Sequence, residues 1–368
     1  MRAQRHPIPM ALVLISTLFM GTPAPVTATD PTTYYVLLSN SVEIGDGSSC
    51  SEPHYVETAA SDDDAIIQAA INAASPGDTI YLCAGTYDIG TTLALGSKTV
   101  TLQGAGAEST ILDGGTDTRI LIGDSMTVSG LTFQNGFIVG SGGAIYADMR
   151  ATVSASRFIN NRATQDGGAV FIPPGTTETL LISSSTFADN RAETGGAISA
   201  WTDAVVTGST FIRNIADETG GAIWSDTAVI RLGSFSENHA EYGGAVNAVN
   251  SATVERSSFT RNVATSYAGA LLAPTALLRS SEFSLNRAGE RAGAVFLYDV
   301  AASDLNQMRR NRFTRNASGR AGAINLERCG MAPTLAEGRR VERANTFIGN
   351  RASVLRRTAN IERTMEDC

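Results

Sequence analysis

The chain has 368 residues with 28 basic and 36 acidic side chains, a net charge of −8, and Lys98 is its single lysine. A chain with this acidic balance lacks the basic surface that nucleic acid requires, so we expect no nucleic-acid partner.

Residues 1–28 have the features of a secretory signal peptide. Arg2 and Arg5 precede an apolar run over residues 11–20, and small residues lead to a predicted cleavage site after Ala28. The apolar run is too short to span a bilayer, and an uncleaved anchor is the alternative interpretation. We therefore expect a secreted or surface-displayed protein with no transmembrane span in the mature chain.

The four cysteines form one pair near each end of the predicted mature chain. In an exported protein this pattern favours two disulfides, although four cysteines allow three pairings. We predict that the disulfides are Cys50–Cys83 and Cys329–Cys368. Spacings this wide argue against a zinc site.

Residues 29–78 form an N-terminal segment with one predicted helix. The stretch "SDDDAIIQAAINAASPGD" has acidic residues in its first turn, a Pro-Gly stop and one apolar face, made of Ile66, Ile67, Ala70 and Ile71. We expect this helix to cover the open end of the repeats that follow over residues 79–352, which would protect unpaired strand edges. Residues 353–368 form a C-terminal cap or tail.

The middle of the chain repeats the pattern Phe-x-x-Asn. From Phe187 to Phe283 successive phenylalanines are spaced by 24 residues, and the spacing lengthens outside this run. Eight units occur, at Phe158/Asn161, Phe187/Asn190, Phe211/Asn214, Phe235/Asn238, Phe259/Asn262, Phe283/Asn286, Phe313/Asn316 and Phe347/Asn350. A fixed period of this length is typical of a repeat architecture in which each unit buries its apolar face against the next.

Between these units lies Gly-Gly-Ala or its variant Ala-Gly-Ala. The first position becomes alanine at Ala268, Ala292 and Ala321, so we expect it to require only a small side chain. The second position stays glycine throughout, which predicts either a positive φ or a close approach of another backbone. These constant glycines are Gly143, Gly168, Gly196, Gly221, Gly244, Gly269, Gly293 and Gly322.

Short stretches rich in valine, threonine and serine follow each glycine pair and predict strands rather than helices. About 24 residues per repeat, short strands and glycine-marked corners together predict an all-β fold, a right-handed parallel β-helix of roughly eleven coils. In such a stack the phenylalanines should form an aromatic column in the core. We expect the asparagines to pass side-chain hydrogen bonds from coil to coil, while their own backbone takes the left-handed conformation of a tight corner.

The alternation of these two motifs over about residues 130–352 resembles the polymorphic outer membrane protein repeats of chlamydial surface proteins. It is also similar to the wider pectin-lyase-like group of β-helices. The resemblance implies a surface adhesin whose paired motifs take part in host-cell attachment. It stops before the C-terminal tail, which is arginine-rich and lacks the alternating strands, about ten residues each, of that family's membrane-embedded part.

These observations favour a non-catalytic protein that adheres to a glycan or to a host or cell-surface protein, with no catalytic residue, metal site or cofactor. Arg213, Arg261 and Arg315 each come just before the asparagine of a Phe-x-x-Asn unit, and they could bind an anionic glycan. The simpler interpretation is that they are turn residues whose side chains are solvated. The alternative is a polysaccharide-degrading enzyme, either a pectate-lyase-like lyase or a glycoside hydrolase. Such enzymes need clustered or paired carboxylates, and we find no motif of that kind.

Overall fold

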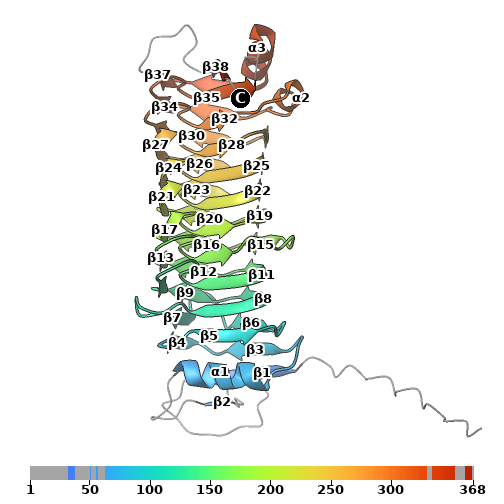
Figure 1. Cartoon of the computed structure of the whole chain (residues 1–368), viewed down its shortest axis with the longest axis vertical. Coiled ribbons are helices and arrows are strands. Elements are labelled where there is room, and N and C mark those ends of the chain that lie inside the picture. The colour runs from blue at the N-terminus through green and yellow to red at the C-terminus, as the bar shows by residue number, and fades with distance from the viewer. Residues whose placement is uncertain are drawn as a thin grey trace, which may run out of the picture. The chain divides into compact units, whose positions relative to one another are not determined.

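The computed structural model describes residues 32–37, 50, 55–56, 63–329, 334–352 and 361–366, all within one compact unit that runs from Pro31 to Cys368. The predicted signal peptide lies outside the described residues, and so does Cys368 of the predicted Cys329–Cys368 disulfide. Within them the chain winds into stacked coils whose strands pair in parallel (Figure 1). The predicted right-handed parallel β-helix is confirmed.

The described strands form three parallel sheets that run along the stack. The phenylalanine sheet has eleven strands in the described part of the chain: β4 (Gly85–Asp88), β7 (Thr110–Asp113), β9 (Thr132–Gln134), β12 (Arg157–Ile159), β16 (Thr186–Ala188), β20 (Thr210–Ile212), β23 (Ser234–Ser236), β26 (Ser258–Thr260), β30 (Glu282–Ser284), β33 (Arg312–Thr314) and β36 (Thr346–Ile348). The narrow sheet has nine described strands: β10 (Phe137–Ile138), β13 (Arg162–Ala163), β17 (Arg191–Thr194), β21 (Ile215–Thr219), β24 (His239–Tyr242), β27 (Val263–Tyr267), β31 (Arg287–Ala288), β34 (Ala317–Ser318) and β37 (Arg351–Ala352).

The broad sheet contains the remaining strands, because many coils place two segments in it. Its eighteen described strands are β1 (Thr33–Leu37), β2 (Tyr55–Val56), β3 (Thr79–Leu82), β5 (Leu93–Gly96), β6 (Thr101–Gly104), β8 (Leu121–Ser129), β11 (Ile145–Ser154), β14 (Val170–Ile172), β15 (Leu180–Ser183), β18 (Ile198–Ala200), β19 (Ala204–Thr207), β22 (Ile223–Arg231), β25 (Val246–Glu255), β28 (Leu271–Ala273), β29 (Ala276–Arg279), β32 (Val295–Leu297), β35 (Ile324–Cys329) and β38 (Ile361–Glu366). In β8, β11, β22 and β25 the two segments merge into one long strand.

Phenylalanines of successive coils lie in register in the phenylalanine sheet and stack on one another inside the coils. From Phe133 to Phe347 neighbouring rings are nearly parallel, with centroids 4.6 to 5.0 Å apart. All of them except Phe347 are fully buried. The constant 24-residue step therefore reflects one ring per coil in a continuous aromatic column.

The ladder asparagines form a second internal column at the corner after each phenylalanine strand. The Asn262 side-chain amide donates to the Phe235 carbonyl and to Oδ1 of Asn286, both at 3.0 Å. The Asn286 amide in turn donates to the Phe259 carbonyl at 2.9 Å and to Oδ1 of Asn316 at 3.0 Å. The same pattern runs from Asn161 to Asn316, so the predicted passage of hydrogen bonds from coil to coil is confirmed.

The predicted left-handed backbone at the ladder asparagines themselves is wrong. None of the eight has a positive φ, and they are Asn161, Asn190, Asn214, Asn238, Asn262, Asn286, Asn316 and Asn350. The left-handed residue lies one position earlier in each coil, at Asn160, Asp189, Arg213, Glu237, Arg261, Leu285, Arg315 and Gly349, with φ between 53° and 61°. This earlier residue turns the chain, and the asparagine side chain that follows can then point inward.

A serine ladder, which the sequence analysis missed, occupies the corner before several phenylalanine strands, and Gly233 takes its place in one coil. The buried hydroxyl of Ser209 accepts from the backbone N–H of Ser185 at 3.1 Å. In the same way, the Ser281 hydroxyl accepts from the backbone N–H of Ser257 at 3.2 Å. Asn311 and Asn345 continue the column toward the C-terminal end. The asparagine and serine columns thus join neighbouring coils by polar groups at two corners, except where Gly233 interrupts the serine column.

The two glycines of the Gly-Gly-Ala motif have different roles. Gly220 has a positive φ of 66°, and Ala268 and Ala292 adopt the same left-handed conformation at their coils, whereas Ala321 does not, so in most coils the first position takes an unusual backbone and not merely a small side chain. At the second position the reason is close backbone approach, because a Cβ on Gly221 would lie 2.1 Å from the Gly244 carbonyl oxygen.

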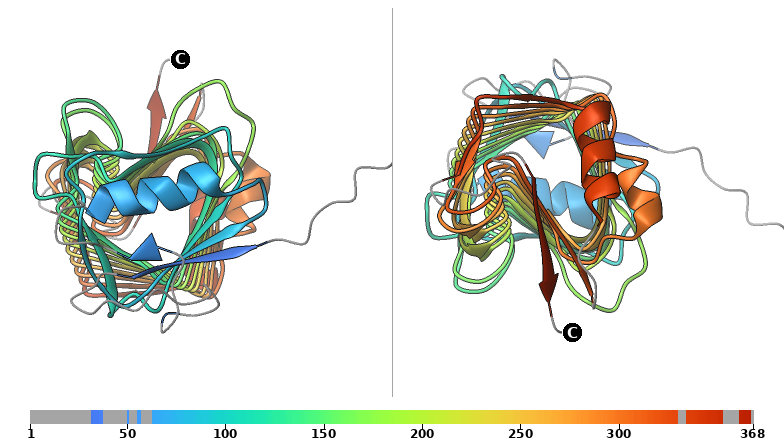
Figure 2. Two further views of the ribbon diagram at one scale, coloured as in Figure 1. Left: turned by 90° about the horizontal axis from the view of Figure 1, so that it is seen from below. Right: turned by 90° about the horizontal axis from the view of Figure 1, so that it is seen from above.

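The N-terminal helix α1 (Asp63–Ala73) lies across the end of the coils, as Figure 2 shows. Its Ile66, Ile67, Ala70 and Ile71 are buried and belong to the main core. The predicted capping helix is therefore confirmed. The predicted disulfide between Cys50 and Cys83 is also present, and it links the segment before α1 to the end of β3.

Lys98, the single lysine, caps the C-terminus of α1. Its ammonium donates to the carbonyls of Ile71, Asn72 and Ala74 at 3.0, 2.7 and 2.9 Å. These are carbonyls that the end of a helix leaves without intrahelical partners, and the positive charge also complements the helix dipole.

Replacing Lys98 by methionine should loosen α1, because the aliphatic stem stays while three hydrogen bonds to the helix end are lost. We expect a cost of about 1–2 kcal/mol for local opening of the cap. Hydrogen exchange of the α1 amides measures this cost, with amides of the central β22 as the internal control. Unchanged protection in α1 would show that the ammonium does not hold the helix.

Two helices lie near the opposite end of the stack, α2 (Ala302–Leu305) and α3 (Leu335–Ala344) (Figure 1). Thr334 and Glu337 form a capping box at the start of α3. The helix ends next to Asn345, whose side chain accepts from the backbone N–H of Asn311 at 2.9 Å. Among the helices of the described residues, none is long and apolar enough to cross a membrane.

Candidate functional site

The motif residues singled out from the sequence lie inside the coils. The ladder phenylalanines and asparagines are fully buried from Phe158 to Asn316, Asn262 and Asn286 included, and only the last pair, Phe347 and Asn350, is less enclosed. From Gly143 to Gly293 the second glycines are buried against the backbone of the next coil. A ligand must therefore contact the side chains between the motifs.

The residues just before the ladder asparagines form an outward column of alternating charge. Arg213 donates two hydrogen bonds to the Asp189 carboxylate, both at 2.7 Å, and these bonds raise the pKa of the guanidinium. Glu237 and Arg261 follow at the next two coils. Because Glu237 separates Arg213 from Arg261 and Leu285 separates Arg261 from Arg315, these arginines do not gather into one cationic surface.

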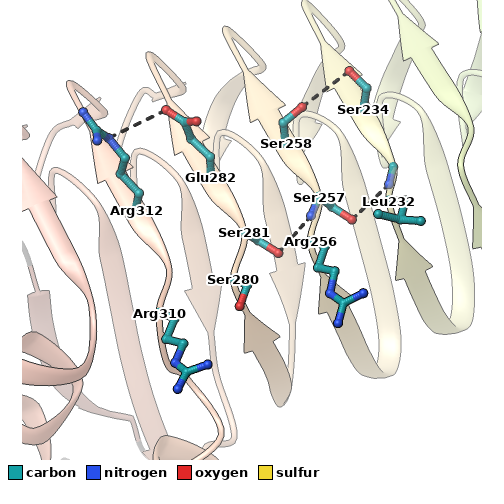
Figure 3. Close-up of a pocket in the computed structure, with 11 residues that line it drawn as sticks. Leu232, Ser234, Arg256, Ser257, Ser258, Ser280, Ser281, Glu282, Arg310 and Arg312 are labelled. Carbon is teal, nitrogen blue, oxygen red and sulfur yellow. Dashed lines mark hydrogen bonds and ion pairs between the residues drawn. The ribbon is translucent and has the colours of Figure 1, made fainter.

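A different set of arginines lines a groove at the corner between the broad sheet and the phenylalanine sheet. This arginine groove has a volume of about 490 Å³ and is lined by two rows of side chains, Leu232, Arg256, Ser280 and Arg310 on one side and Ser234, Ser258, Glu282 and Arg312 on the other. Figure 3 shows both rows, with Ser257 and Ser281 of the serine ladder between them. The groove runs along the stack, across four successive coils.

The corner geometry explains why these side chains point outward. Leu232, Arg256, Ser280 and Arg310 all have a positive φ, between 50° and 60°. Each is followed by a residue of the buried serine ladder, or by Gly233 in its place. Since the ladder residue points inward, the left-handed residue before it faces solvent.

An adjoining recess of about 350 Å³ extends the arginine groove onto the broad sheet. It shares Leu232, Arg256 and Ser280 with the groove and adds Arg231, Glu255 and Arg279. Together the two hollows contain five arginines, at positions 231, 256, 279, 310 and 312, against two carboxylates, Glu255 and Glu282. On a chain with a net charge of −8, this is a local excess of positive charge.

Three of the five arginines are engaged by the two carboxylates. Arg231 and Arg279 lie 3.3 and 3.8 Å from Glu255, and Arg312 lies 3.9 Å from Glu282. Arg256 and Arg310 are exposed, and neither side chain has an ion pair or hydrogen bond to another described residue. These two guanidiniums are the groups most available to a ligand.

The chemistry of this surface is suited to binding an anion. The two carboxylates line different hollows, Glu255 the recess and Glu282 the groove, and each contacts arginine. No group of three or more His, Cys, Asp and Glu side chains that could hold a metal ion occurs among the described residues. Arginine, by contrast, offers planar donors that match carboxylate, sulfate and phosphate oxygens.

One coil of this stack matches a repeat of a known protein family. Residues 155–173 match the Chlamydia polymorphic membrane protein repeat. The match begins at the left-handed corner residue Ala155, includes Phe158, Asn161 and the Gly167-Gly168 pair, and ends after β14. It therefore contains one complete copy of the core motif, whereas the arginine groove lies in later coils. No curated protein and no solved structure matches the chain.

A second outward feature is an aromatic pair on the broad sheet. The rings of Trp201 and Trp224 are 4.6 Å apart, and Trp201 is 43% exposed whereas Trp224 is 8% exposed. Burial, together with the nearby Asp203 charge, raises the pKa of Asp226 in the same two coils. Because Trp224 is nearly buried, it supports the Trp201 ring. Trp201 is the aromatic surface that a ligand could reach.

Sequence reasoning did not find the arginine groove, although a signal was present. Arg256, Ser280 and Arg310 each lie three residues before a ladder phenylalanine. Aligning the repeats on the phenylalanines would have placed them in one column, with Arg231, Glu255 and Arg279 in the neighbouring column. These positions vary between repeats, whereas the positions of the two motifs stay nearly constant.

Proposed function

We propose that the protein is a non-catalytic, secreted or surface-displayed β-helix that recognises a glycan or protein surface through the arginine groove. The observation that carries the proposal is the excess of arginine along one corner of the stack, with Arg256 and Arg310 free of ion pairs within the described residues. The one matched copy of a chlamydial membrane-protein repeat and the predicted signal peptide support a place outside the cytoplasm.

The regular stack suits recognition of an extended partner. Each coil presents equivalent positions about 4.8 Å from those of its neighbour, so contacts can repeat along a polymer or a broad surface. The core columns of phenylalanine and asparagine keep this spacing, because they are buried and bonded from coil to coil. The outward residues can then vary without loss of the fold.

Incubation of the purified full chain with a panel of polysaccharides and extracellular proteins tests the proposal. We expect retention on at least one acidic or cell-surface ligand, with no new reducing or unsaturated ends after prolonged incubation. Release of such ends would overturn the non-catalytic function in favour of a lyase or hydrolase. Lack of retention on every member of the panel would overturn recognition itself.

The surface location has its own test. In the native organism, the chain should be recovered in the medium or should be accessible to an impermeant reagent on intact cells, with a cytoplasmic enzyme as the control. Protection from the reagent in intact cells, with labelling only after lysis, would contradict the proposed location.

A further inference from the structure

We propose that the arginine groove binds an acidic polysaccharide that lies along the stack, with its acidic groups on Arg256 and Arg310. This inference rests on the proposed function and names the ligand class for the same site. Figure 3 shows Arg256, Ser280 and Arg310 in one row along the groove.

The spacing of the two available arginines along the stack matches a linear polymer. Arg256 and Arg310 belong to coils that are two apart, since Ser280 occupies the same corner in the coil between them. Two coil spacings amount to about 10 Å. A cation, a hydroxyl and a second cation thus follow one another along the groove. A linear acidic polysaccharide likewise presents charged groups separated by hydroxyls.

The guanidiniums of Arg256 and Arg310 are ready to bind an acidic group. Neither must leave an ion pair with a described residue before it binds, and each can donate two parallel hydrogen bonds to a carboxylate or a sulfate. The remaining arginines, at positions 231, 279 and 312, stay with Glu255 and Glu282 and add to the local positive field. The Ser280 hydroxyl lines the groove and can bond to sugar hydroxyls, whereas the Ser258 hydroxyl donates to Ser234 at 3.5 Å.

The lining of the groove favours a glycan over other polyanions. Neither the groove nor its recess is lined by an aromatic side chain, so the stacking platforms that bind single-stranded nucleic acid are missing from this part of the described chain. Serines and arginines match a polymer of acidic groups and hydroxyls.

The test compares the full chain with two double variants on immobilised polygalacturonate, dextran sulfate and neutral dextran, and with duplex DNA in solution. The variant Arg256→Gln with Arg310→Gln removes the two available guanidiniums. The control Arg213→Gln with Arg261→Gln makes the same change of net charge in the other outward column. Thermal unfolding and circular dichroism check that both variants fold, as expected for exposed side chains.

We expect the native chain to bind at least one acidic polysaccharide, and the groove variant to bind it about tenfold or more weakly. The control variant should stay within about twofold of the native chain, and binding should weaken as salt increases. Polygalacturonate and dextran sulfate separate a carboxylate ligand from a sulfate ligand. Either preference supports the inference.

Several results would overturn the inference while leaving the proposed function intact. These are equal binding by the native chain and the groove variant, an equal loss in the control variant, or retention only on neutral glycan or on protein. Binding of duplex DNA as tight as binding of the acidic polysaccharides would overturn the ligand class. Failure of the native chain to bind any of the ligands, including those of the wider panel, would overturn the proposed function as well.

Discussion

Replacing Gly221 by alanine should destabilise the stack by about 3 kcal/mol or more. The new Cβ would lie 2.1 Å from the Gly244 carbonyl oxygen and 2.6 and 2.7 Å from the backbone O and N of His239. All three contacts are with backbone, so no side chain can rotate away, and adjacent coils would have to separate. Urea denaturation of the purified variant, followed by circular dichroism, measures the effect.

The neighbouring Gly220 supplies a matched control. Its alanine variant must adopt a left-handed backbone and would place Cβ 2.4 Å from the Ile223 carbonyl oxygen of its own coil, but Ala268 and Ala292 are accommodated at the equivalent corner of their coils. We therefore expect Gly220→Ala to cost less than Gly221→Ala, about 1–2 kcal/mol. Similar losses for the two variants would contradict the distinction between a contact within one coil and a contact between the backbones of two coils.

The second large effect is expected from Asn214→Ala. The Asn214 amide donates to the Phe187 carbonyl and to Oδ1 of Asn238, both at 3.0 Å. Its oxygen accepts from the backbone N–H and the side chain of Asn190, at 3.1 and 2.9 Å. Alanine would leave these buried partners without their bonds, at a cost of about 3–6 kcal/mol in total.

The free energy of unfolding of Asn214→Ala, measured by urea denaturation, checks this value. Asn250→Ala is the matched control, because Asn250 is exposed on β25 and its loss should change stability by less than about 0.5 kcal/mol. A small effect at Asn214, close to that at Asn250, would mean that the internal ladder does not hold the coils together.

The fold was predictable from the sequence because its periodic positions face the core. A phenylalanine every 24 residues can be buried in every unit only if the units stack in register, as the ring column from Phe133 to Phe347 does. The capping helix was predictable for a similar reason, since Ile66, Ile67 and Ile71 share one face that needs a partner.

The backbone conformation of each corner was harder to predict, because several conformations are compatible with the same residues. The left-handed residues are Arg261 and Leu285, and not the ladder residues Asn262 and Asn286 that follow them. The first glycine of each Gly-Gly pair adopts the left-handed backbone of the turn. The second glycine has no positive φ and lets the backbone of the next coil approach closely. In each case the sequence shows which residue recurs at the corner, but it does not show which residue of the corner makes the turn.

The serine ladder was hidden because serine is common in exposed strands as well. Ser281 is buried and bonds to the neighbouring coil, whereas the adjacent Ser280 lines the groove. Nothing in the local sequence separates the two residues. Only the three-dimensional register of the coils distinguishes the structural serine from the outward one.

The arginine groove was not predictable from any one repeat. Arg256 and Arg310 are 54 positions apart in the sequence, and only the stacking of coils places them along one corner. Arg213, by contrast, looked available in the sequence but is held by Asp189. Pairing between coils decides which charges remain free, and the order of residues along one coil does not reveal it.

The most direct test of the proposed division between core motifs and an outward binding groove is a crystal structure of the full chain with an acidic oligosaccharide. We predict that its carboxylate or sulfate oxygens lie within hydrogen-bond distance of the Arg256 and Arg310 guanidiniums, with the sugar chain running along the stack. An oligosaccharide bound at Trp201 or over the narrow sheet, with the arginine groove empty, would contradict this prediction.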